Sequence, residues 1–216
     1  MRISHEAIST ALSVRPRGTF KRELVRDLRR RQRFRRPRKG RLSSRPIQDL
    51  ISIDARPPEV TDRTGPGHGE GDLLVGPAHA SALGTLVERT TRCTVLVPLK
   101  ATDAATVRQA FARELRTRPA QLRRSRTYDP GPEMREPRLF TKPTTMRVYF
   151  AHPHSPWERG TNEHTTGLLR QFFPNGTRFT RLSRREIKRV QGMLNDRPRK
   201  ILNWHSPAHA FHQRLH

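Results

Sequence analysis

The sequence predicts an α/β fold built on a central sheet, and two features support this. Short apolar segments of strand character alternate with longer segments of helical spacing between residues 73 and 173. Only 32% of the 216 residues are hydrophobic, so the apolar core must be modest and concentrated in that stretch. We therefore expect one domain of ordinary size preceded by a less apolar appendage.

The appendage comes first. Residues 1–36 are predicted to form a basic helical segment, because Leu24, Val25 and Leu28 make a thin apolar stripe at helical spacing. Residues 37–58 turn to Pro, Ser, Gly and Arg, which is typical of a linker. The remaining residues, 59–216, are predicted to form the α/β domain with additional helices at its C-terminal end.

The predicted elements of that domain follow in order. Three apolar runs divided by turn residues are typical of a strand meander: 73–75, 82–88 and 93–99. A helix is predicted over 103–116, because Val107, Phe111 and Leu115 share one face. A strand, a second strand and a helix are then predicted at 126–128, 146–150 and 161–173. This order is that of the ribonuclease H-like fold, which has a mixed five-stranded sheet with flanking helices.

The charge of the chain predicts a polyanionic partner. With 44 Lys and Arg against 19 Asp and Glu, the formal net charge is +25. Such a surplus repels itself unless a polyanion neutralises it, and nucleic acid gains affinity through counterion release. Residues 15–45 alone hold fifteen Lys or Arg; a solvated arm is the alternative there to nucleic-acid contact. No apolar run approaches the ~18 residues of a membrane span, so we expect no membrane and a cytoplasmic, nucleoid-associated location.

Three acidic residues in separate segments are candidates for one metal site. Asp72 lies in HGEGDLLVG, Asp129 in RTYDPGPEM, and Glu163 in SPWERGTNEHTTG, with 33 residues between Asp129 and Glu163. Each has an ordinary alternative. Glu70 shares a strand face with Asp72 and could be the ligand instead. Asp129 could begin a turn, with Glu133 close behind, and Glu163 could be a first-turn acid favoured by the helix dipole.

Five segments carry a resemblance to a known family: HGEGDLL, GTLVERTTR, PHSPWERGTNE, GLLRQFFPNGT and LNDRPRK. Over residues 56–211 the chain resembles the DDE transposases of bacterial insertion sequences, most closely the IS-thirty family. The resemblance implies a ribonuclease H-like integrase core that cleaves DNA phosphodiesters with water and joins the new 3′ hydroxyl to target DNA. Asp72, Asp129 and Glu163 would then be the catalytic residues and the metal ligands. Carboxylates without cysteine suit Mg²⁺ or Mn²⁺, and two ions are expected.

The resemblance also implies partners. We expect double-stranded DNA, both transposon ends and target, and a homo-oligomer assembled on it. Arg159 and Asn162 flank Glu163 near a helix N-terminus, which favours anions. The predicted DNA-binding residues are Arg159, Asn162, Arg170, Arg197, Arg199 and Lys200. Trp157 is predicted to pack under the start of the helix.

The chain also departs from the family it resembles. Gly69 stands where members usually carry an aromatic residue, and His152 stands where they usually carry Asp. The chain begins well inside a full-length member, which suggests an N-terminally truncated and decaying copy. The alternative function is therefore a non-catalytic basic nucleic-acid-binding protein derived from a transposase.

Overall fold

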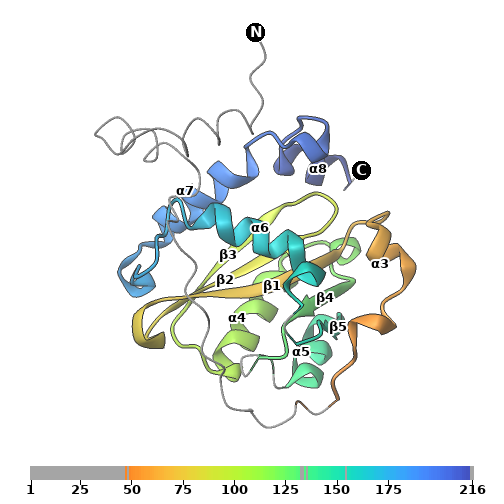
Figure 1. The fold of residues 1–216 in the computed structure, drawn as a ribbon, viewed down its shortest axis with the longest axis horizontal. Coiled ribbons are helices and arrows are strands. Elements are labelled where there is room, and N and C mark those ends of the chain that lie inside the picture. The colour runs from red at the N-terminus through yellow and green to blue at the C-terminus, as the bar shows by residue number, and fades with distance from the viewer. Residues whose placement is uncertain (1–46, 48, 132–133, 135, 154, 215–216) are drawn as a thin grey trace, which may run out of the picture. The chain divides into compact units, whose positions relative to one another are not determined.

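Five strands form one mixed sheet at the centre of the fold (Figure 1). The computed structural model describes residues 47, 49–131, 134, 136–153 and 155–214. The strands are β1 (His68–Val75), β2 (Ala82–Glu88), β3 (Thr94–Leu99), β4 (Ser125–Tyr128) and β5 (Arg147–Phe150). The predicted basic segment 1–36 and residues 37–46 of the predicted linker lie outside the described residues.

The strand order is β3-β2-β1-β4-β5. β1, β2 and β3 form an antiparallel meander, whereas β4 pairs parallel to β1 and β5 parallel to β4. This confirms the predicted mixed five-stranded sheet. The first strand begins five residues before the predicted 73–75, because its opening half, His68 to Asp72, holds polar residues and glycine that give no apolar signal.

Helices flank the sheet (Figure 1). They are α3 (Pro58–Asp62), α4 (Ala104–Arg116), α5 (Pro137–Thr144), α6 (Gly160–Leu169), α7 (Arg184–Asn195) and α8 (Pro207–Gln213). Asp103 caps α4 by accepting a hydrogen bond from the Thr106 amide at 2.9 Å. The helix predicted over 161–173 ends at Leu169, four residues early. No helix among the described residues is long and apolar enough to cross a membrane.

Two apolar clusters cover opposite faces of the sheet. On one face Val107, Phe111 and Leu115 of α4 pack with Tyr128 and Phe140. Gly84 makes room for Phe111, because a Cβ there would lie 2.2 Å from the Phe111 ring. On the other face α6 and α7 pack with Leu74, Leu83 and Leu96 through Leu168, Leu169, Ile187 and Val190. The acidic residues of β1 point toward this second face.

Candidate active site

Parallel pairing of β1 with β4 brings Asp72 and Asp129 together. Glu70 pairs with Thr127, and two residues further along each strand this register leads to Asp72 and Asp129. The Asp72 side chain is partly exposed and that of Asp129 mostly exposed. Two carboxylates are thus presented side by side where β4 ends.

Arg159 lies between these two carboxylates. It comes from the short 3-10 helix Pro156–Arg159 that leads into α6. Its Nη2 is ion-paired to Asp129 Oδ2, and its Nη1 lies 4.0 Å from Asp72 Oδ1. Nη1 also donates to the Gly71 carbonyl at 3.0 Å. One cationic group therefore occupies the position that both aspartates share.

Glu163 lies in the first turn of α6, exposed to solvent. The helix packs on β1 and β2. Thr85, which pairs with Asp72 across the sheet, donates a hydrogen bond to the Asn162 side chain at 3.1 Å. Glu163 is therefore carried on the same side of the sheet as Asp72. Within the described residues, however, no three His, Cys, Asp or Glu side chains are grouped to hold a metal ion.

Glu70 has a different environment from Asp72. It is fully buried; its Oε2 accepts a hydrogen bond from the Asn162 amide at 2.8 Å, and its Oε1 lies 3.2 Å from Arg89 Nε. Both oxygens are thus held by the protein interior, which favours Asp72 over Glu70 as the acid available to a ligand. The anchoring role of Glu70 was not foreseen from the sequence, although its two-residue spacing from Asp72 placed both on one strand face.

The predicted DNA-binding residues differ in how they are placed. Asn162 is fully buried and Arg159 is 7% exposed, so both side chains contact the protein interior in this structure. Arg170 is half-buried near Asp72: burial lowers its pKa, while the Asp72 charge raises it. Arg197 and Arg199 are also half-buried, and Arg199 Nη2 donates to the Leu194 carbonyl at 3.1 Å. Lys200 is exposed.

The segment before α6 corrects one prediction. Trp157 is 73% exposed, so the expectation that it packs under the helix start is wrong. Glu158 instead secures this segment, because its carboxylate bonds the backbone amide and the ring Nδ1 of His152, both at 2.8 Å. His152 Nε2 also lies 3.1 Å from Asp54. The Glu158 hydrogen bond and the Asp54 charge raise the pKa of His152.

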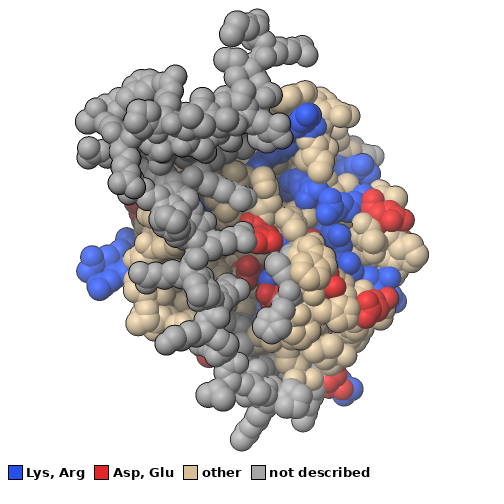
Figure 2. All heavy atoms as spheres, in the orientation of Figure 1, with Lys and Arg blue, Asp and Glu red and all other residues tan. Residues whose placement is uncertain are grey.

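The carboxylates at this site fit a hard divalent cation by their chemistry. Mg²⁺ and Mn²⁺ prefer oxygen ligands, and Asp72 and Asp129 already converge on one positive group. A metal ion bound by both would replace the Arg159 guanidinium. Figure 2 shows acidic side chains near the middle of this face and basic side chains to one side of them, toward α3.

The mixed five-stranded sheet with its flanking helices defines a class of fold: the ribonuclease H-like fold of integrase cores. The structure is similar to the catalytic core domain of BIV integrase, with a TM-score of 0.54 and 14% identity, over 70% of this chain and 97% of that one. At this identity the likeness shows the fold alone. No family model matches the chain.

Sequence relatives narrow the class. The chain is 45% identical over 216 residues to the transposase for insertion sequence element IS1086 of Cupriavidus metallidurans, covering all of this chain and 64% of the relative. It is 38% identical over 211 residues to transposase InsI for IS30A of Escherichia coli, covering 96% and 55%. The chain thus spans a little over half of these relatives' length. They confirm the resemblance to the IS-thirty (IS30) family of transposases.

Proposed function

We propose that this chain acts as a transposase catalytic core that cleaves DNA phosphodiesters and joins the resulting 3′ hydroxyl to target DNA. The single observation that carries the proposal is the convergence of Asp72 and Asp129 on one cationic group, on the face of the sheet over which α6 brings Glu163. The relatives named as transposases support it. Double-stranded DNA, as transposon ends and target, would be the substrate, and a homo-oligomer in the nucleoid the working form.

Asp72, Asp129 and Glu163 would hold the divalent ions, Mg²⁺ or Mn²⁺ and two in number. When bound, such ions activate the entering oxygen and stabilise the leaving one in an in-line displacement at phosphorus. The residues of the chain do the positioning. β1 and β4 fix the two aspartates, and the Glu70 anchor fixes the start of α6. Arg159, once released from the aspartates, would contact the phosphate that enters between them.

DNA affinity in this proposal is mostly electrostatic. With a net charge of +25, binding should weaken steeply with salt and vary little with sequence. Phosphate contacts from exposed residues such as Lys200 would position the duplex without reading its bases.

A second function, nucleic-acid binding without catalysis, is favoured by two observations. Arg159 takes the cation position, and the described residues contain no ready three-residue metal group. The two functions give different outcomes with the full 216-residue chain and a supercoiled plasmid. A catalytic core nicks the plasmid with Mg²⁺ or Mn²⁺ and stops when a chelator is added. A pure binder shifts the plasmid on a gel under all conditions and never nicks it, and that result would overturn the proposal.

A further inference from the structure

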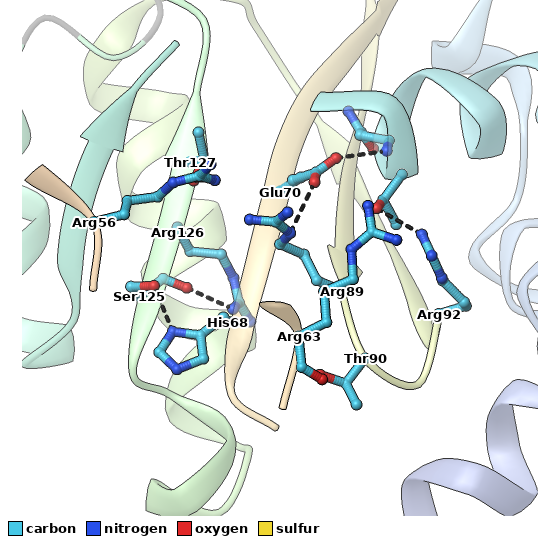
Figure 3. Close-up of polar contacts among 12 residues, drawn as sticks. Arg56, Arg63, His68, Glu70, Arg89, Thr90, Arg92, Ser125, Arg126 and Thr127 are labelled. Carbon is cyan, nitrogen blue, oxygen red and sulfur yellow. Dashed lines mark hydrogen bonds and ion pairs between the residues drawn. The ribbon is translucent and has the colours of Figure 1, made fainter. Parts of the chain in front are cut away.

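Four arginines gather around Glu70, which lies two residues before Asp72 on β1 (Figure 3). We call Arg56, Arg63, Arg89 and Arg92 the arginine group. Arg89 and Arg92 come from the turn between β2 and β3, Arg63 from the end of α3, and Arg56 from the segment before it. Arg92 Nη1 donates to Thr161 Oγ1 at 2.6 Å, and Arg56 Nη1 to Thr127 Oγ1 at 3.5 Å. The group thus borders the first turn of α6.

Negative charge inside the arginine group is scarce. Among the described residues, the pair of Arg89 with Glu70 is the ion pair that this group makes. The pKa of Arg89 is lowered to about 10, chiefly by burial and further by the charges of Arg56, Arg63 and Arg92, against the raising effect of Glu70. Burial and the Arg63 charge likewise lower the pKa of Arg92. The arginines therefore repel one another, and burial adds to the free-energy cost of their charge.

The group also has unused hydrogen-bond donors. Arg89 is 5% exposed, yet within the described part of the chain its Nη1 has no hydrogen-bond partner, and neither has the buried Nε of Arg56. Leaving a buried donor unpaired is costly. A phosphate supplies several anionic acceptors, and guanidinium groups bind phosphate with paired, charge-assisted hydrogen bonds. Arg63 and Arg92 remain partly exposed, which leaves an approach from solvent.

We propose that the arginine group is a phosphate-binding site, separate from the aspartate pair, that holds one phosphate of the DNA strand beside the phosphate to be cleaved. Glu70 precedes Asp72 by two residues on β1, a separation of roughly 6.6 Å along a strand. A phosphate on the arginine group would therefore fix the register of the strand at the aspartates. Its identity as DNA phosphate rests on the proposed function, whereas phosphate binding itself does not.

The first test is thermal unfolding of the full chain in phosphate and in chloride at equal ionic strength. The wild type should unfold at a higher temperature in phosphate, because an anion that binds only the folded state stabilises it. The double variant Arg63→Gln/Arg92→Gln should unfold at the same temperature in phosphate and in chloride. In chloride it should be at least as stable as the wild type. The matched control, Arg113→Gln/Arg116→Gln, removes two exposed charges from α4 on the opposite face of the sheet. It should still unfold at a higher temperature in phosphate than in chloride. Equal unfolding temperatures of the wild type in both salts would overturn the site.

The second test asks whether the phosphate belongs to DNA. Duplex affinity is measured over a range of salt for the same proteins. Log affinity falls as log salt rises, and each lost phosphate contact makes this negative slope shallower by about 0.9. Arg63→Gln/Arg92→Gln should make the slope shallower, whereas the control variant should leave it unchanged. If the double variant does not fold, the single variant Arg63→Gln is measured in its place. If phosphate stabilises the wild type but the double variant has an unchanged salt slope, the site binds phosphate but not the phosphate of DNA. Plasmid nicking tests the proposed function separately.

Discussion

The carboxylate of Glu70 accepts a hydrogen bond from the backbone amide of Asn162 at 2.8 Å. Glu70 lies two residues before Asp72 on β1, and Asn162 lies one residue before Glu163 on α6. This one bond therefore joins the strand that carries the first candidate acid to the helix that carries the third. The Arg89 ion pair holds the second oxygen of the same carboxylate and completes the anchor.

Glu70→Gln should destabilise the fold strongly, because it leaves the buried Arg89 charge uncompensated among three other arginines. Breaking a buried ion pair costs about 3–5 kcal/mol. Urea unfolding measures the loss, with Asp62→Asn, an exposed acid at the end of α3, as the control. A loss no larger than that of the control would show that the Glu70–Arg89 ion pair does not stabilise the fold.

Gly69 and Arg126 should be energetically coupled. A Cβ at Gly69 would lie 2.5 Å from Arg126 Nη1 and 2.8 Å from the Val87 carbonyl oxygen. Gly69→Ala should therefore cost about 1–3 kcal/mol, as overpacking does. The loss should be smaller in an Arg126→Ala background, where only the Val87 contact remains, and a double-mutant cycle measures the difference. Equal losses in both backgrounds would remove Arg126 as the reason that this position holds glycine.

The pKa of His152 should lie above the unfolded value of about 6.5, because Glu158 and Asp54 stabilise the charged ring. Since the folded-state pKa is raised, the stability it contributes is complete below the unfolded value and is lost as pH rises through the folded one. Titration of the ring proton by NMR gives the value, with His152→Gln to assign the signal. Glu158→Gln should lower the pKa more than Asp54→Asn does. A wild-type pKa at or below 6.5 would contradict the assigned contacts.

The sequence predicted the sheet and its pattern well, because β2 and β3 are apolar and β4 and β5 are short runs between turns. The predicted β1 was too short, because the first half of this strand is buried although it consists of polar residues and glycine. The side-by-side placement of Asp72 and Asp129 follows from the parallel pairing of β1 and β4, as the family resemblance implied.

The contacts around α6 could not be predicted from spacing. Arg159 was predicted to contact DNA, and in this structure its guanidinium pairs with the two aspartates. Asn162 sits beside Glu163 in the sequence, yet the helix turns it into the sheet against Thr85. Trp157 was expected inside and lies outside, since the chain turns into the 3-10 helix at that point. Such outcomes depend on the direction in which a turn presents each side chain.

The central claim, that Asp72, Asp129 and Glu163 act as one metal-dependent site, is tested most directly by plasmid nicking and duplex affinity measured together on Glu163→Gln. The substitution keeps the size of the exposed side chain and removes the charge that a metal ion needs. Nicking in Mg²⁺ should fall by about three orders of magnitude or more, with duplex affinity unchanged or slightly raised, while Asp62→Asn keeps both. Nicking by Glu163→Gln at the wild-type rate would contradict the assignment of Glu163.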